Sequence, residues 1–234
     1  MRRAGSYNGG FVARKGDGTG IALLSVLALA GAAAAFRGSG ASRNADPRAQ
    51  IERALALVPE LVLRWVNHEN GTDLTDPNEV ESFHLSDLNA PPKQVLDWWA
   101  RETGLTYVGQ GNQRVVFRLV DGSVLKLALD DWGREGNERE IETWREAQGD
   151  LEVLDLLVPI LSGNEDFIHM AGADPLSSAR LRADPQLAAR FMARLKVANN
   201  FGWEGRLMAD DFATPMNWGI HDGEIKILDY EAAQ

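Results

Sequence analysis

The chain of 234 residues contains no cysteine and only four histidines. The absence of cysteine excludes disulfide bonds, thiolate metal sites and cysteine nucleophiles. The histidines are scattered without the paired spacing that is typical of zinc ligands, so a zinc site is not expected. No serine lies in the Gly-x-Ser-x-Gly pattern of a nucleophile elbow.

Acidic residues outnumber basic ones outside the N-terminus. Residues 1 to 48 carry seven lysines or arginines and two aspartates, a net charge of +5, so the rest of this chain of formal charge −10 carries −15. Proteins bind nucleic-acid backbones through clustered cations, and the acidic body therefore argues against DNA or RNA as a partner. The composition, 44% hydrophobic and 25% charged, is that of a globular protein with a sizeable core.

Residues 1–45 form a basic leader around an uncharged apolar segment, residues 20–36. As a helix this segment would span about 25 Å, slightly less than the roughly 30 Å hydrocarbon core of a bilayer. It can be interpreted as a membrane anchor, as a cleaved signal peptide or as an alanine-rich helix packed against protein. Basic residues on both flanks leave the orientation of an anchor open.

Residues 46–92 predict a helical module followed by a polar linker. Asp46 and Pro47 form a helix-start signal, and apolar residues at helical spacing predict one helix over residues 47–67. The polar stretch after it carries a second start signal at Asp76. Residues 92–103 predict a further helix that ends at Gly104.

Residues 93–234 mix strand and helix patterns, which predicts an α+β domain with an antiparallel sheet. Segments 107–119 and 123–129 are rich in β-formers and are joined by Asp121-Gly122, a strong hairpin signal. An acidic turn is expected over residues 130–136. We expect further strands over 156–161 and 166–170, helices over 137–148 and from 184 onward, and a last hairpin of 218–221 and 224–228.

Two features of the first hairpin indicate phosphate binding. Gly109 and Gly111 have no Cβ atoms, so the backbone around them can approach a triphosphate and offer N–H groups to its oxygens. Such a pair alone is more often a simple turn. Lys126 lies within an apolar strand, where an unpaired ammonium is costly, so an anionic partner is expected. The alternative is an edge-strand lysine whose stem covers apolar surface.

Two oxygen-bearing side chains lie at the ends of the last hairpin. Asn217 precedes its first strand and Asp229 follows its second. Mg²⁺ prefers carboxylate, carbonyl, water and phosphate oxygens as ligands. Apolar neighbours would place the Asp229 carboxylate at the rim of a core, where it needs a cation or strong donors. The two residues therefore predict a site for magnesium with a nucleotide.

In this order along the chain, the motifs over about residues 95–232 resemble those of a protein-kinase-like fold, including the small kinase-like proteins of bacteriophages. Gly109-Gln110-Gly111 and Val116 are similar to the kinase glycine loop, with Arg114 in the place of its third glycine. Asn217-Trp218-Gly219 and Ile227-Leu228-Asp229-Tyr230 are similar to the catalytic asparagine and the D-F-G motif. Glu231 replaces the glycine of that motif.

The resemblance implies a minimal two-lobe fold with a short second lobe that ends just after Asp229. The helices expected from the residue pattern, including the N-terminal apolar one, precede this fold. It implies ATP and Mg²⁺ as cofactors. Among the acidic residues of the helix over 137–148, Glu140 is the expected partner of the lysine, with Glu138 and Glu142 as alternatives. The implied roles are nucleotide binding by Gly109, Gly111, Val116, Lys126, Glu140 and the linker backbone from Met170 to Gly172, magnesium binding by Asn217 and Asp229, and catalysis by Lys126 and Asp211.

Two functions are compatible with these residues. The first is a minimal ATP-dependent phosphotransferase in which Asp211 accepts a proton, although it precedes Asn217 by six positions and the kinase pattern has five. The second is a non-catalytic, pseudokinase-like module tethered by its N-terminus. The sequence names neither the phosphate acceptor nor a protein partner. ATP chemistry favours a body that is cytoplasmic, or membrane-anchored through residues 20–36 on the cytosolic side, over a secreted one.

Overall fold

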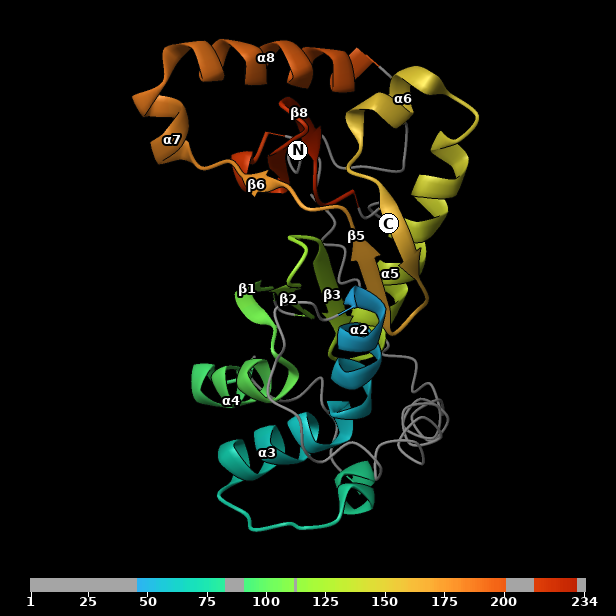
Figure 1. Ribbon diagram of the computed structural model, residues 1–234, viewed down its shortest axis with the longest axis vertical. Coiled ribbons are helices and arrows are strands. Elements are labelled where there is room, and N and C mark those ends of the chain that lie inside the picture. Colours follow the sequence, from blue (N-terminus) through green and yellow to red (C-terminus); the bar gives the residue numbers. More distant parts are fainter. Residues whose placement is uncertain (1–45, 83–90, 112, 201–212, 231–234) are drawn as a thin grey trace, which may run out of the picture.

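The computed structural model describes residues 46–82, 91–111, 113–200 and 213–230. This part of the chain is α+β, with an antiparallel sheet between two groups of helices (Figure 1). The basic leader and its apolar segment, residues 20–36, lie outside the described residues. Within the four described ranges, no helix combines the length and the apolar character that crossing a bilayer requires.

The secondary structure runs along the chain as helices, a sheet interrupted by two helices, two further helices and a last hairpin. The elements are α2 (Pro47–Ala56), α3 (Val58–Asn70), the 3₁₀ turn η2 (Pro77–Ser82), α4 (Lys93–Thr103), β1 (Thr106–Gln110), β2 (Arg114–Arg118), β3 (Val124–Ala128), α5 (Asp131–Ala147), α6 (Leu151–Leu156), β4 (Ile160–Gly163), β5 (Phe167–Met170), β6 (Asp174–Pro175), α7 (Ser178–Ala183), α8 (Pro185–Asn200), the 3₁₀ turn η4 (Pro215–Asn217), β7 (Trp218–His221) and β8 (Glu224–Ile227).

The larger sheet has the strand order β1-β2-β3-β5-β4, and all its neighbours are antiparallel. The turn between β2 and β3 contains Asp121 and Gly122, as predicted, with Gly122 at a φ of 87°. The smaller sheet has the order β6-β7-β8. Its hairpin turns at Asp222 and Gly223, whose φ values of 50° and 81° are those of a primed hairpin turn. The predicted last hairpin is confirmed.

The prediction of one helix over residues 47–67 was wrong. The chain forms α2 and α3, separated at Leu57, where φ is −98° and ψ is 1°. Pro59 explains the break, because it has no N–H for a continuous helical ladder and fits the first turn of a new helix. The helices predicted at 92–103 and from 184 onward correspond to α4 and α8.

Three boundaries within residues 93–234 also differ from prediction. Residues 107–119 contain parts of two strands, because the chain reverses between Gln110 and Arg114, while Gly109 lies in β1 and pairs with Val116. The expected turn over residues 130–136 is instead the first part of α5, which Asp130 caps by accepting a hydrogen bond from the Gly133 N–H. The expected strand over 156–161 begins at Ile160, since Asp150 caps the helix α6 before it.

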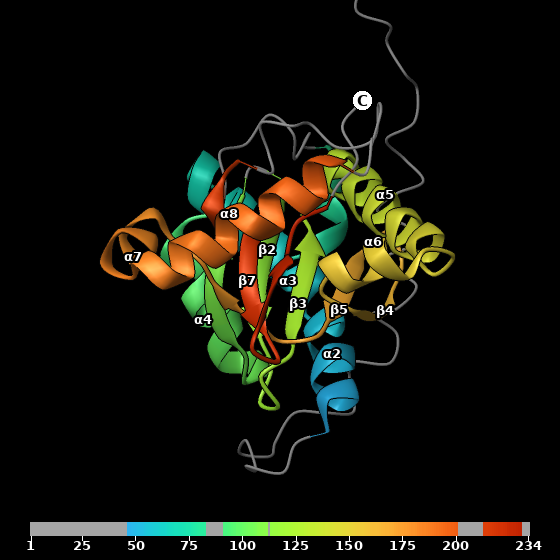
Figure 2. The same cartoon turned by 90° about the horizontal axis from the view of Figure 1, so that it is seen from above.

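The two faces of the larger sheet contact two different hydrophobic clusters. Strand alternation gives one face to Val115, Phe117 and Leu125, which pack with α2, α3 and α4. The other face contributes Val124 and Met170 to a cluster with α5, α6, α8 and the β7–β8 hairpin. Figure 2 shows α8 lying across this hairpin, with α5 and α6 beside it. The second cluster anchors the last hairpin against the sheet.

Candidate functional site

Lys126 lies at the centre of a buried ionic cluster. Its strand β3 is in the middle of the larger sheet, and its side chain is only 8% exposed. The Nζ atom donates to Glu140 Oε1 at 2.7 Å and to the Leu228 carbonyl at 2.8 Å. It also lies 3.5 Å from Asp229 Oδ1. The predicted anionic partner of Lys126 is therefore present, and the alternative of an edge lysine is wrong.

Glu140 enters the cluster from α5, which packs on the same face of the sheet as Lys126. Its side chain has no exposed surface, and both carboxylate oxygens lie within 3.0 Å of Lys126 Nζ. The alternatives Glu138 and Glu142 are exposed. Since a buried carboxylate needs cations or donors, the helix presents the one glutamate that the strand lysine can neutralise.

Arg114, the first residue of β2, adds a second cation. One guanidinium nitrogen donates to Glu140 Oε2 at 2.8 Å, and the other donates to Asp229 Oδ1 at 2.9 Å. The side chain is 11% exposed. Arg114 therefore connects the strand after the glycine turn, helix α5 and the end of the last hairpin.

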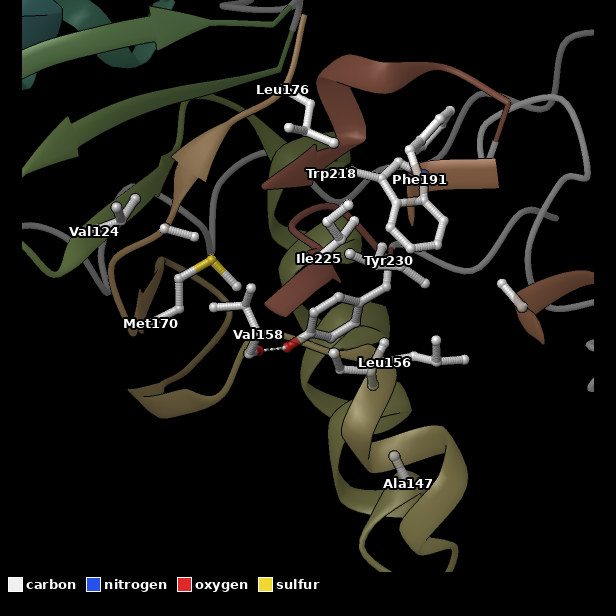
Figure 3. Close-up of a cluster of buried hydrophobic side chains, with 14 of the residues drawn as sticks. Val124, Ala147, Leu156, Val158, Met170, Leu176, Phe191, Trp218, Ile225 and Tyr230 are labelled. Atoms are coloured by element: carbon white, nitrogen blue, oxygen red, sulfur yellow. Dashed lines mark hydrogen bonds between the residues drawn. The ribbon is translucent and has the colours of Figure 1, made fainter. Parts of the chain in front are cut away.

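Asp229 is fixed by the hydrophobic residues on both sides of it. Ile227 and Tyr230 are fully buried, and the Tyr230 hydroxyl donates to the Val158 carbonyl at 3.0 Å (Figure 3). Burial, followed by the nearby carboxylates of Glu140 and Asp229, raises the pKa of Tyr230, so this hydroxyl remains a donor. The Asp229 side chain is 41% exposed, which places its carboxylate at the rim of the core, as predicted.

Opposing effects act on the pKa of Asp229. Burial raises it, but the positive charges of Lys126 and Arg114 outweigh burial and lower the pKa to about 2. The carboxylate is therefore ionised at neutral pH. Among the described residues its ionic and hydrogen-bond partners all contact Oδ1. Within the described part of the chain, neither of these two cations engages Oδ2.

Among the described residues, the cluster brings together two positive and two negative groups, whose charges sum to zero. Buried charges are tolerated only when each is paired and hydrogen-bonded, and these four satisfy one another. They come from β2, β3, α5 and the end of β8, over more than a hundred positions of sequence. A charged constellation of this kind in a strand-and-helix core is a candidate functional site.

The glycine turn next to the cluster is open. A Cβ atom added at Gly109 or Gly111 would meet no other atom within 4 Å. The turn is held at its base, where the Gly111 N–H donates to the Arg114 carbonyl and the Leu129 N–H donates to the Gln113 carbonyl, each at 2.9 Å. Among the described residues, Gly109 and Gly111 therefore leave space for a ligand in the direction that a Cβ atom would take.

The other predicted binding residues lie on or next to strands of the two sheets. Val116 of β2 pairs with Lys126 of β3. Met170 of β5 pairs with Val124, which lies two positions before Lys126 in β3. The Gly172 carbonyl accepts a hydrogen bond from His221 Nδ1 at 2.8 Å. Asn217 lies beside the residue before Asp229, because the Leu228 N–H donates to its carbonyl at 2.7 Å.

The predicted catalytic base, Asp211, lies outside the described residues, as does Glu231. Within the described part of the chain, no group of three or more His, Cys, Asp or Glu side chains could hold a metal ion. The two predicted magnesium ligands, Asp229 and Asn217, would by themselves supply too few oxygens, so phosphate and water oxygens would have to complete the coordination.

Sequence analysis did not assign Arg114 or the Leu228 carbonyl to the site. Arg114 was placed only as a substitute for a glycine. The signal that could have found it is strand alternation: Arg114 and Val116 share a face of β2, and Val116 lies opposite Lys126. The Leu228 carbonyl carries no side-chain signal, because any residue has a backbone oxygen.

Comparison with protein-family models, with curated proteins and with solved structures finds no match to this chain. The charged cluster and the topology of the two sheets therefore carry the functional argument.

Proposed function

We propose that this chain is a kinase-like protein that binds ATP with Mg²⁺. The observation that carries the proposal is the convergence of Lys126, Glu140 and Asp229 in one buried cluster. The sequence motifs placed these three residues in the roles of phosphate-binding lysine, lysine partner and metal ligand. In kinases the lysine–glutamate pair and the metal-binding aspartate must be in place together.

The surroundings of the cluster support the same function. The glycine segment before Arg114 offers open space at Gly109 and Gly111, while the Gly111 N–H is already donated to the Arg114 carbonyl. Lys126 and Arg114 are cations that can bind phosphate oxygens, and Glu140 holds both in position. Asp229, through Oδ2, and Asn217 would hold the metal, which would neutralise phosphate charge when it is bound. The linker from Met170 to Gly172 is the proposed adenine-contacting backbone.

Transfer of the terminal phosphate to an acceptor is the enzymatic form of this proposal. In it, Asp211 would accept the acceptor's proton, and catalysis would depend on positioning and electrostatic stabilisation. The non-catalytic, pseudokinase-like form is favoured by a specific observation: the Arg114 guanidinium is hydrogen-bonded to the proposed metal ligand Asp229. A cation at that position opposes a metal ion nearby.

Thermal unfolding with and without Mg-ATP tests the nucleotide site. A ligand at about one hundred times its dissociation constant adds about 2.7 kcal/mol to the free energy of unfolding, so we expect a rise in Tm of roughly 5–10 °C. Lys126→Met should abolish this rise. Lys226→Met is the matched control, because Lys226 lies on β8 outside the cluster and 3.7 Å from Asp155. No rise for the wild type at millimolar Mg-ATP would contradict the proposal.

Phosphate transfer is tested separately from binding. With radiolabelled ATP and a generic acceptor protein, Asp211→Asn should lose transfer and keep the Mg-ATP rise in Tm. If the wild type shows the rise and no transfer, the non-catalytic form is the correct one.

A further inference from the structure

We infer that a cavity between α3 and α4 is a second binding site, which takes a small organic carboxylate. The cavity has a volume of about 550 Å³, within the range of sites for small molecules. Among the described residues, its lining comes from these two helices alone. The inference does not depend on the proposed nucleotide function.

The cavity lies away from the ionic cluster. Helices α3 and α4 are at the end of the described structure opposite α8, and they pack on the apolar face of the larger sheet (Figure 1). Lys126 contacts α5 on the other face of this sheet. The sheet therefore separates a ligand in the cavity from the proposed nucleotide site.

Each helix lines the cavity with a polar stripe beside its buried one. Gln94, Trp98 and Arg101 are four and three residues apart in α4, which places them on one side of that helix. Helix α3 contributes Arg64 and His68, four residues apart. The stripes that face the core are apolar and contain Leu61 and Trp65 in α3 and Leu96 and Trp99 in α4.

Two contacts hold the Arg64 guanidinium in place. It stacks on Trp98, with its carbon 3.9 Å from the centroid of the ring. Its Nε and Nη2 atoms donate to Glu60 Oε1 at 3.3 Å and 2.9 Å. The Nη1 atom has no hydrogen-bond partner within the described ranges, so it remains a donor for a ligand. A side chain that is already ordered loses less conformational freedom when the ligand binds.

Arg101 supplies the positive charge that a ligand would neutralise. Glu60 contacts Arg64, and Glu69 lies 3.7 Å from His68 Nδ1. Arg101 is exposed, and in the part of the chain that the structure describes it forms neither an ion pair nor a hydrogen bond. One such cation matches the single negative charge of a carboxylate, which a guanidinium binds through two parallel N–H groups.

The lining also provides a place for the organic part of the ligand. Val95 and the half-buried Trp98 lie between the polar residues of α4. Their apolar surface can pack against a ring or a short hydrocarbon chain. None of the lining residues within the described ranges is acidic, so a carboxylate meets no like charge in the cavity itself.

A titration of the ¹⁵N-labelled full chain with benzoate, followed by two-dimensional NMR, tests this site. Benzoate should shift the amide signals of α3 and α4 with a saturable Kd of about 1 mM or less, a modest affinity for a compound of this size. Benzyl alcohol has a similar shape and no charge, so it should bind roughly tenfold more weakly. Phenyl phosphate should bind no more tightly than benzoate.

Arg101→Gln should weaken benzoate binding roughly tenfold and leave benzyl alcohol unchanged, because only the charged hydrogen bonds are lost. Lys93→Gln is the matched control. Lys93 is an exposed cation of the same helix that pairs with Asp97 and is not part of the lining. Its substitution should change the affinity for benzoate by less than about twofold.

Lys126→Met separates the two sites, since it should bind benzoate at α3 and α4 as the wild type does. The inference is overturned if benzoate shifts no signals of these helices at millimolar concentration, or if benzyl alcohol binds as tightly as benzoate. Equal effects of Arg101→Gln and Lys93→Gln, or tighter binding of phenyl phosphate, would also overturn it. The proposed nucleotide function, which is tested with Mg-ATP, would stand in each of these cases.

Discussion

The two faces of the larger sheet differ in what they stabilise. Toward α2, α3 and α4, the strands present Val115, Phe117, Leu125 and Leu127, all buried in one apolar cluster. Toward α5, the same strands present Arg114 and Lys126 in the ionic cluster. Because successive side chains of a strand point to opposite faces of the sheet, adjacent residues of β3 belong to different clusters. The apolar face stabilises the sheet, and the charged face carries the proposed nucleotide site.

The largest loss of folding stability is expected from a substitution on the apolar face. Phe117 is fully buried, with its ring centroid 4.4 Å from that of Trp99 and 5.8 Å from that of Tyr107. Phe117→Ala should lower the free energy of unfolding by about 4 kcal/mol, through lost burial and a cavity. Urea unfolding measures this loss. Mg-ATP should still bind the folded fraction, and a loss of affinity comparable to that of Lys126→Met would contradict the separation of the two faces.

On the charged face, the largest stability effect is expected at Glu140. Glu140→Gln leaves Lys126 and Arg114 without a fully buried carboxylate, and breaking a buried ion pair costs about 3 kcal/mol or more. Glu138→Gln, at an exposed position of the same helix, should stay within about 0.5 kcal/mol of the wild type. Equal effects of the two substitutions, measured by urea unfolding, would show that the ionic cluster is not buried in solution.

Asp229 should contribute less to stability, because it is 41% exposed. Its pKa, about 2 in the folded chain, lies below the ordinary value of 3.8. The ionised carboxylate therefore stabilises the fold above about pH 4, and this contribution is lost as the pH falls toward 2. Asp229→Asn should change stability at pH 7 by about 1 kcal/mol or less and should flatten the acid side of the stability curve. An unchanged acid slope would argue against the contacts with Lys126 and Arg114.

The smallest stability effect is expected at the glycine turn. Gly109→Ala with Gly111→Ala should leave the free energy of unfolding within about 0.5 kcal/mol, because added Cβ atoms meet open space. Affinity for Mg-ATP should fall roughly tenfold if the turn backbone approaches phosphate, since this corresponds to about one lost hydrogen bond to a charged group. Calorimetry provides the affinity. A destabilised variant with normal affinity would reverse the interpretation of this turn.

The sequence predicted those parts of the fold and site that depend on local signals. The turns at Asp121-Gly122 and Asp222-Gly223 and the stop of α4 at Gly104 follow from backbone conformations that few residues adopt. Lys126 and Asp229 were found because charges inside apolar segments need partners.

Features that depend on tertiary contacts were missed or left open. Glu140 was expected as the partner of Lys126 and is confirmed, but Glu138 and Glu142 stayed open as alternatives until the side of α5 that faces the sheet was known. The role of Arg114 required the register of β2 and β3 and the position of Asp229, 115 residues away in sequence. The break at Leu57 had a local cause, Pro59. The prediction of one helix followed the apolar periodicity of residues 47–67 and disregarded this proline.

A calorimetric titration of the wild type with ATP, performed with magnesium and with a chelator, tests the central claim most directly. The account predicts one saturable site whose affinity is at least roughly tenfold greater with magnesium, and no binding by Lys126→Met under the same conditions. Absence of binding heat at millimolar ATP in both conditions, or equal binding by the wild type and Lys126→Met, would contradict the assignment of the charged face as a nucleotide site.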